Sequence, residues 1–175
     1  MKMPSCWLLL VSFVLSLATV PAHGAGEKKD YPPTAAQDAL EAACKQASAE
    51  SKMVFVKSGF PECGWCRVFD RYHAASDVQQ ILGKYYVVVA IDTSYMPDGR
   101  AVFSKLAKPG APSWVIIAPD KTVIVDSYAT AGNVGYPLQP KETEHYTAAL
   151  KKATPKITDQ ELQTLSQQIK KAAGK

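Results

Sequence analysis

Two cysteines separated by two residues carry the chemistry that this sequence indicates most directly. Cys63, Gly64, Trp65 and Cys66 form a Cys-x-x-Cys motif. Two thiols three positions apart, on one turn of a helix, can close into a disulfide and open again. The attacking species in this chemistry is a thiolate, so the site needs surroundings that stabilise the anion. The motif therefore predicts a redox-active dithiol.

The flanking segments predict where the pair lies. Residues 53–58 have the apolar, β-branched composition of a strand, and residues 67–72 continue an apolar helical stripe that begins at Trp65. A cysteine at the junction lies at the helix N-terminus, where the helix dipole and the free N–H groups favour its anion. We therefore assign Cys63 as the nucleophile. Cys66, one turn deeper, is the resolving thiol that attacks a mixed disulfide on Cys63.

Charged and aromatic neighbours are candidates for tuning the pair. Lys57 and Arg67 add positive potential, whereas Glu62, next to the first cysteine, opposes it. Lys57 has a second interpretation, as a lysine whose ammonium extends to the surface. Trp65 offers an aromatic wall beside the thiol. Lys57 and Glu62 are thus the candidate pKa-tuning residues, and Trp65 is a candidate substrate contact.

Other uses of a Cys-x-x-Cys motif remain to be weighed. A static disulfide is one alternative. A structural zinc site needs four ligands, and only Cys44 and three scattered histidines could complete the set. Covalent haem attachment requires histidine after the second cysteine, and that residue is Arg67. The sequence therefore predicts neither a metal nor an organic cofactor.

The first 24 residues have the pattern of a secretory signal peptide. Lys2 supplies the positive region, residues 7–20 are apolar, and small residues suited to cleavage follow. An uncleaved anchor is the alternative. Residues 25–33 are polar, end in two prolines and predict a flexible lead-in. Cys6 leaves with the leader, so Cys44, Cys63 and Cys66 would remain, in an oxidising compartment.

Charge and composition exclude several function classes. The net charge is +4, and it becomes +3 when Lys2 is removed, because residues 1–24 hold no acidic residue. No basic cluster points to nucleic acid. A mature chain of roughly 150 residues can form one domain with a real core. We expect a single domain over 34–175, with its core at about 52–153.

Hydrophobic periodicity predicts the remaining elements. The predicted helices cover about 36–47, 67–72, 77–82, 98–107, 142–152 and 158–171, and the predicted strands cover 53–58, 85–91, 113–118 and 122–126. Thr34 is a predicted N-cap, and Thr158 with Glu161 has capping-box spacing. From residue 53 the order is β-α-β-α-β-β-α, which implies a parallel pair and a late antiparallel hairpin. The continuous apolarity of 85–91 predicts a strand at the sheet centre.

A second motif completes a resemblance to a known family. Gly110, Ala111, Pro112, Ser113 and Trp114 stand just before a predicted strand, about forty-five residues after the first cysteine. With the Cys-x-x-Cys motif, its flanking elements and the hairpin, this segment resembles the thioredoxin superfamily, specifically its exported bacterial thiol:disulfide interchange members. The resemblance spans residues 34–153. It implies an α/β thioredoxin-like fold: a central mixed sheet of about four strands flanked by helices, with an extra N-terminal and C-terminal helix.

The resemblance also implies roles for individual residues. Pro112 would follow a cis peptide bond, which is rare and usually deliberate. The backbone of Ala111 would then be exposed for strand-like pairing with a substrate polypeptide. This chain departs from the family at Glu62, where tryptophan is usual, at Trp65, where proline is usual, and at Lys57, where a buried acid is usual. The departure at Lys57 puts a proton relay through that carboxylate in doubt.

The function implied is that of an exported, periplasmic thiol-disulfide oxidoreductase. It would exchange disulfides with protein thiols or disulfides, act as a monomer and bind no nucleic acid. A reductant would draw electrons from a membrane redox partner, whereas an oxidant would need reoxidation, and the sequence leaves the direction open. The alternatives are a non-catalytic binding module that uses the groove near Pro112, and a metal-handling chaperone.

Four further features have two interpretations each. Cys44 is either a small buried hydrophobe or a third redox thiol. His73 is either a helix-end or surface residue or a proton shuttle. Trp114 packs in the core or lines a groove. The apolar stripe of the helix at 158–171 covers the domain or forms a dimer contact.

Overall fold

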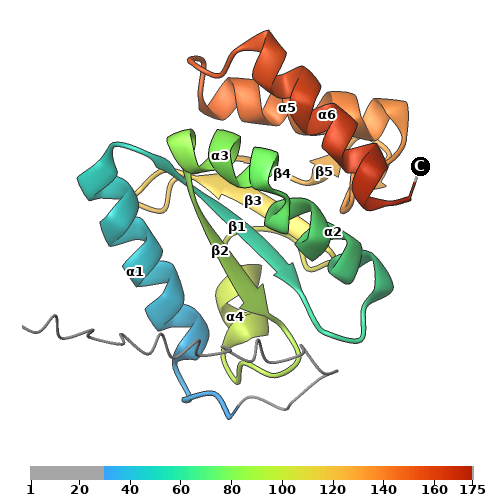
Figure 1. Ribbon diagram of the computed structural model, residues 1–175. Coiled ribbons are helices and arrows are strands. Elements are labelled where there is room, and N and C mark those ends of the chain that lie inside the picture. The colour runs from blue at the N-terminus through green and yellow to red at the C-terminus, as the bar shows by residue number, and fades with distance from the viewer. Residues whose placement is uncertain (1–29, 175) are drawn as a thin grey trace, which may run out of the picture.

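The computed structural model describes residues 30–174, and these form an α/β fold (Figure 1). The elements are α1 (Ala35–Glu50), β1 (Met53–Gly59), α2 (Gly64–Ala74), α3 (Ser76–Tyr85), β2 (Tyr86–Asp92), α4 (Gly99–Ser104), β3 (Ser113–Ile117), β4 (Val123–Asp126), β5 (Tyr128–Ala129), β6 (Gly132–Asn133), α5 (Pro140–Ala153) and α6 (Asp159–Ala172). The predicted leader and residues 25–29 of the lead-in lie outside the described residues. Between residues 30 and 174 no helix combines the length and apolarity needed to cross a bilayer.

The four main strands form a mixed sheet in the order β2-β1-β3-β4. β1 pairs in parallel with β2 through the crossover made by α2 and α3, and it pairs antiparallel with β3. β3 and β4 form the antiparallel hairpin that the sequence predicts. The predicted fold class is thus confirmed. Between β4 and α5, where the sequence predicts no helix or strand, the structure has the short β5–β6 pair.

The prediction that residues 85–91 form the centre of the sheet is wrong. β2 is an edge strand, and the centre consists of β1 and β3. One face of β2 packs towards α1 through Val87, Val89 and Ile91. On the other face Val88 is 39% exposed. Valine and isoleucine favour strands through their branched side chains, so an apolar run indicates a strand without showing how many neighbours it has.

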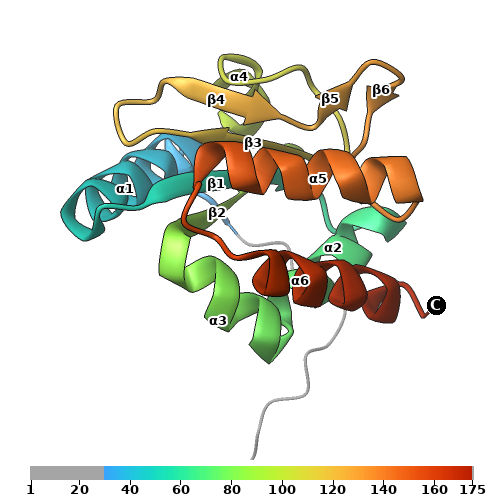
Figure 2. The ribbon, with the colours of Figure 1, turned by 90° about the horizontal axis from the view of Figure 1, so that it is seen from above.

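Each face of the sheet is covered by its own set of helices (Figure 2). Alternation along β1 sends Val54 and Val56 into the core under α1 and α4, and Phe55 into the opposite core. That second core is formed by α2, α3, α5 and α6. It is rich in aromatic residues, and Phe55 stacks on Trp114 at 5.8 Å between ring centroids. Helix α2 is therefore held against the same sheet face as the largest core side chains.

The start of α1 differs from its prediction. Thr34 occupies the N-cap position, but its side chain accepts no backbone N–H there; its hydroxyl donates to the Asp38 carboxylate instead. The free N–H groups of Ala36 and Gln37 donate to the carboxylate of Asp98, each at 2.9 Å. The cap is thus supplied from a residue more than sixty positions away, which no local pattern could indicate.

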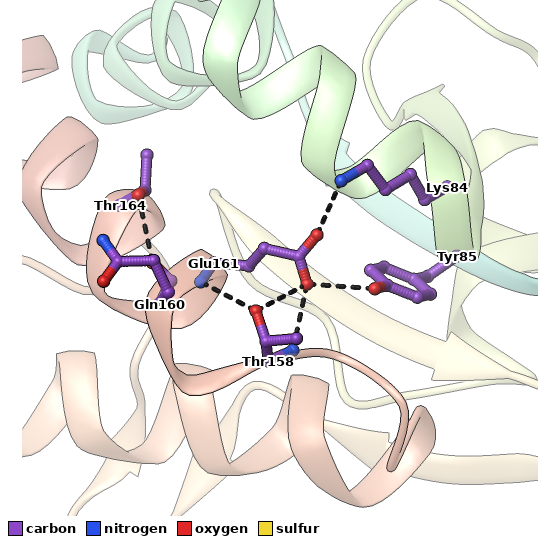
Figure 3. Close-up of polar contacts among 6 residues, drawn as sticks. All are labelled: Lys84, Tyr85, Thr158, Gln160, Glu161 and Thr164. Atoms are coloured by element: carbon purple, nitrogen blue, oxygen red, sulfur yellow. Dashed lines mark hydrogen bonds and ion pairs between the residues drawn. The ribbon is translucent and has the colours of Figure 1, made fainter.

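The C-terminal helix α6 is tied to the domain through Glu161 (Figure 3). Its carboxylate accepts from the ammonium of Lys84 at 2.7 Å and from the hydroxyl of Tyr85 at 2.9 Å, both at the end of α3. The same carboxylate completes the predicted capping box with Thr158, whose N–H donates at 2.9 Å. The apolar stripe of α6, including Leu165, is buried in the chain's own core.

Glu161 should make the protein less stable in acid. The Lys84 ammonium, followed by the Thr158 N–H, lowers the pKa of Glu161 to about 2. A lowered pKa adds stability above the unfolded-state value of about 4.3, and that stability is lost as the pH falls towards 2. We expect Glu161→Gln to lower the free energy of unfolding at pH 7 by about 1–2 kcal/mol and to flatten its decline between pH 4.5 and 2.

Urea denaturation at pH 7, 4 and 2.5 measures both effects. Glu144→Gln is the matched control, because Glu144 is exposed on the neighbouring helix α5. Equal losses of unfolding free energy in the two variants would contradict this role of Glu161. An unchanged pH dependence of the unfolding free energy in Glu161→Gln would also contradict it.

Candidate redox site

Cys63 and Cys66 form a disulfide at the start of α2, with their Cα atoms 5.2 Å apart. Cys63 is the N-cap residue, and its sulfur accepts the backbone N–H of Cys66 at 3.2 Å. Cys63 is partly exposed, whereas Cys66 is buried. An incoming nucleophile therefore meets the sulfur of Cys63 first, and the helix N-terminus is positioned to stabilise a thiolate there.

The end of β1 presses against the inner cysteine. A Cβ atom at Gly59 would lie 2.8 Å from Sγ of Cys66, so only glycine allows the strand to approach this closely. The predicted strand ends at residue 58, so the sequence indicated no role for Gly59. Its position directly after an apolar strand, four residues before a Cys-x-x-Cys motif, was the available signal.

Lys57 forms an ion pair with Asp70 of α2. Two residues before Gly59 on β1, it faces the same side of the sheet, and Asp70 lies one helical turn after Cys66. The ion pair is thus one turn along α2 from the inner sulfur. The side chain of Lys57 is 14% exposed, so it is neither an unpaired charge beside the cysteines nor a freely solvated surface lysine.

Glu62 is exposed and accepts a hydrogen bond from the hydroxyl of Tyr95, in the loop after β2. That hydroxyl is the main cause holding the pKa of Glu62 below its ordinary value, with a further contribution from the positive charge of Arg67. Glu62 is therefore an anion at neutral pH. It lies next to the accessible cysteine, where a negative charge disfavours a thiolate.

We expect these two charges to shift the reduction potential in opposite directions. Glu62→Gln removes a negative charge beside Cys63, stabilises the reduced thiolate and should raise the potential. Lys57→Met removes a positive charge, leaves Asp70 unpaired and should lower it. Each shift should be roughly 10–30 mV. Equilibration with glutathione or dithiothreitol at pH 7 measures them.

Lys156→Met is the control for the lysine, since Lys156 is exposed and follows α5, away from the cysteines. Lys57→Arg should keep the wild-type potential because it keeps the charge. Shifts of the same sign in Glu62→Gln and Lys57→Met would contradict this electrostatic account.

A groove of about 310 Å³ lies beside the disulfide. It brings together Trp65, Ala111 and Pro112, the three predicted substrate contacts, although the sequence separates them by more than forty residues. Trp65 is 51% exposed and stacks on Tyr136, with ring centroids 5.7 Å apart. The other lining residues are Asn133, Val134, Gly135, Tyr136, Leu138, Gln139 and Glu142. The sequence did not indicate this second wall, which comes from residues 133–139 and the start of α5.

The loop before β3 presents free backbone to the groove. Ala111 is exposed, Pro112 is buried, and the peptide bond between them is cis. Within residues 30–174 neither the N–H nor the C=O of Ala111 takes part in a hydrogen bond. An extended polypeptide in the groove could therefore pair with both groups.

The structure places the secondary candidates away from the disulfide or inside the core. Cys44 is a residue of α1 and packs in the core between that helix and the sheet, on the opposite face from α2. Burial raises the pKa of its thiol. Trp114 is fully buried, as the packing interpretation predicts. No group of three or more potential metal-ligating side chains occurs among the described residues.

His73 lies in the last turn of α2, but its ring points into the core rather than to the surface. It contacts Phe69 edge-on at 4.4 Å between centroids, and its Nδ1 is 2.9 Å from the Phe69 carbonyl. Burial, and then the charge of Lys57, lowers the pKa of His73 to about 3. The imidazole is thus neutral throughout the physiological range. The helix-end interpretation of His73 is therefore confirmed, although helical spacing alone does not show that aromatic residues surround this face.

Comparisons with known proteins agree with this geometry. The family model described as "Thioredox_DsbH: Protein of unknown function, DUF255" matches residues 29–173. A disulphide isomerase from Xylella fastidiosa Temecula1 has a similar structure, with a TM-score of 0.51 and 16% identity, over 83% of this chain and 98% of that chain. No curated protein sequence matches this chain.

Two further solved structures are less similar. A thioredoxin from Thermus thermophilus has a TM-score of 0.46 and 18% identity, over 65% of this chain and 86% of that one. A structure described as a DsbH oxidoreductase has a TM-score of 0.44 and 13% identity, over 77% of this chain and 92% of that one.

Proposed function

The chain belongs to the Thioredox_DsbH family, within the thioredoxin superfamily, and from this premise we propose that it is an exported thiol-disulfide oxidoreductase acting on polypeptides. The family and the Cys-x-x-Cys pair support a redox enzyme. One observation carries the proposal further: a partly exposed Cys63 and a buried Cys66 lie beside a groove whose edge, at Ala111, offers unpaired backbone.

The geometry supports a two-step exchange. In the reducing direction, the Cys63 thiolate attacks one sulfur of a substrate disulfide, forms a mixed disulfide and releases the other substrate sulfur as a thiolate. The Cys66 thiolate then attacks Sγ of Cys63, which closes the Cys63–Cys66 bond and releases the second substrate thiolate. Two electrons pass to the substrate, and the released thiolates take up protons from solvent. The oxidising direction is the reverse.

Trp65, Ala111 and Pro112 are the proposed substrate contacts. Trp65 and Tyr136 together present a stacked apolar surface, on which a substrate side chain can pack. The backbone groups of Ala111 pair with an extended substrate segment, and this orients the substrate sulfur towards Cys63. Lys57 and Glu62 are the proposed tuning residues.

The proposed setting is the periplasm. Residues 1–24 would act as the signal peptide, residues 25–33 as a lead-in, and residues 34–175 as one domain. The protein would act as a monomer and would use no metal or organic cofactor. After each turnover a membrane redox partner would restore the starting redox state.

The test is the equilibrium reduction potential of the mature protein, measured in glutathione and dithiothreitol buffers, with Cys63→Ser as control. A potential near −270 mV, as in thioredoxin, would mark a reductant, and one near −120 mV an oxidant. If the Cys63–Cys66 pair is neither reduced nor reoxidised in these buffers, the proposed oxidoreductase function is refuted. Polypeptide binding by such a protein would support a non-catalytic module, and stoichiometric metal retention lost in Cys63→Ser would support a metal-handling chaperone.

A further inference from the structure

A network of hydrogen-bonded polar side chains supports the Ala111–Pro112 loop. Ser58, Ser113 and Ser127 are the three buried polar residues of the described chain, and all are linked to this loop. The hydroxyl of Ser58, at the end of β1, lies 3.2 Å from the Gly110 carbonyl and 3.4 Å from the Ser113 carbonyl. The hydroxyls of Ser113 and Ser127 are 2.8 Å apart.

The last member of this hydrogen-bond network is Asn133, which lies on the wall of the groove. Its Oδ1 accepts from the Ser127 hydroxyl at 2.8 Å and from the Gly135 N–H at 3.1 Å. Its Nδ2 donates to the Pro112 carbonyl at 2.9 Å. One carboxamide therefore joins the residue after β4, the turn after β6 and the proline loop.

The direction of every bond in this network follows from donor and acceptor chemistry. The Gly135 N–H can only donate and the Pro112 carbonyl can only accept, which fixes the orientation of the Asn133 amide. Ser127 must then donate to Oδ1, so Ser113 must donate to Ser127. The Ser127 oxygen also accepts the Trp114 N–H at 3.2 Å. The hydrogen bonds among Ser113, Ser127 and Asn133 therefore have one arrangement.

The backbone around the amide is packed too closely for another arrangement. A Cβ atom at Gly110 would lie 2.5 Å from Nδ2 of Asn133, and one at Gly135 would lie 2.9 Å from the Pro112 oxygen. Gly135 also has a φ of +54°, which favours glycine. The two glycines therefore let the backbone pack closely around the amide and the Pro112 carbonyl.

We propose that Asn133 is a positioning residue that holds the Ala111–Pro112 loop in the conformation that receives a polypeptide substrate. This inference rests on the proposed oxidoreductase function and adds a residue that the motifs did not single out. Asn133 contacts neither sulfur in the described structure. It should therefore affect polypeptide substrates, which need the loop, and leave the electron chemistry of Cys63 and Cys66 unchanged.

The experiment compares two substrates in the same variants. Asn133→Ala removes all three hydrogen bonds, and Asn133→Asp keeps the acceptor but loses the donor to Pro112. We expect both variants to raise KM for insulin reduction about tenfold, with kcat changed less than twofold. The reduction potential and the rate with a small disulfide, oxidised glutathione, should stay at wild-type values. Thr130→Ala, an exposed change in the β5–β6 turn, is the matched control.

Each failure has its own signature. A wild-type protein whose disulfide does not cycle with either substrate would refute the proposed function, and the inference with it. A wild-type protein that reduces insulin, with Asn133 variants that have the same KM, would overturn the inference alone. An equal loss of activity with glutathione and with insulin would also overturn it, because that result indicates general damage to the site. A shifted reduction potential of the Asn133 variants would overturn it for the same reason.

A spectroscopic measurement tests the hydrogen bond from Asn133 to the Pro112 carbonyl without any enzymatic reaction. Asn133 is the only asparagine in the sequence, so labelling with ¹⁵N-asparagine gives one side-chain amide nitrogen, with one signal for each of its two hydrogens. We expect one Nδ2 hydrogen to show a smaller temperature coefficient than the other, because it is bonded to the Pro112 carbonyl. Equal coefficients, typical of two solvent-bonded hydrogens, would overturn the proposal.

Discussion

Replacement of Cys66 by serine is expected to stop turnover and to leave polypeptides attached to Cys63. Cys63 is the accessible sulfur at the N-terminus of α2, and Cys66 is buried one turn below it. Without the inner thiolate the mixed disulfide has no internal nucleophile to resolve it. We expect insulin reduction to fall by at least about 1000-fold in Cys66→Ser and in Cys63→Ser. Only Cys66→Ser should accumulate the mixed disulfide, seen as a mass increase that dithiothreitol reverses.

Cys44→Ser is the matched control for these variants. Cys44 is buried under α1 on the other face of the sheet, so it should neither trap a substrate nor change the rate. Trapping by Cys63→Ser rather than by Cys66→Ser would reverse the assigned roles. Retention of activity in both variants would remove the pair from the mechanism.

Trp114→Ala is expected to cause the largest loss of stability of the variants considered. The indole is fully buried, stacks on Phe55 and contacts Tyr146 edge-on at 5.4 Å. Its Nε1 donates to the Gly135 carbonyl at 3.0 Å. Truncation leaves a large cavity and an unpaired carbonyl. We expect the free energy of unfolding to fall by about 3–5 kcal/mol, measured by urea denaturation.

Trp65→Ala is the control for Trp114→Ala, because it removes a tryptophan side chain that lies outside the core. Trp65 is 51% exposed, so its removal should change the free energy of unfolding by less than about 1 kcal/mol. It should instead weaken polypeptide reduction, because the groove loses one wall. Similar destabilisation in the two variants would contradict the burial of Trp114.

Local patterns were enough to predict most elements. The capping box at Thr158 and Glu161, the β3–β4 hairpin and the helix that begins beside Cys63 depend on residues close together in the sequence. Such features form from neighbouring backbone groups, so their residue types can be recognised without knowledge of the fold. The chemistry of the pair was predictable for the same reason, because both thiols lie on one helical turn.

Contacts between distant segments were not predictable in this way. The edge position of β2 depends on which strands pair, and the cap of α1 comes from Asp98. Lys57 was interpreted either as a positive charge near the cysteines or as a lysine that extends to the surface, and only the fold shows that it is paired with Asp70 of α2. His73 lies at a helix end, as one of its two interpretations predicts, but only packing shows that its ring contacts the core aromatic residues.

The sequence by itself determined the dithiol chemistry, the position of Cys63 at a helix N-terminus and the α/β fold class, because these depend on local spacing and periodicity. Which residues line the groove beside the pair follows only from tertiary packing. The wall formed by Asn133 and Tyr136 reaches Trp65 and Pro112 only after β3, β4 and α5 have packed against β1 and α2. A hydrogen bond such as that from Asn133 to Pro112 joins residues twenty-one positions apart, and it exists only when the whole sheet places them together.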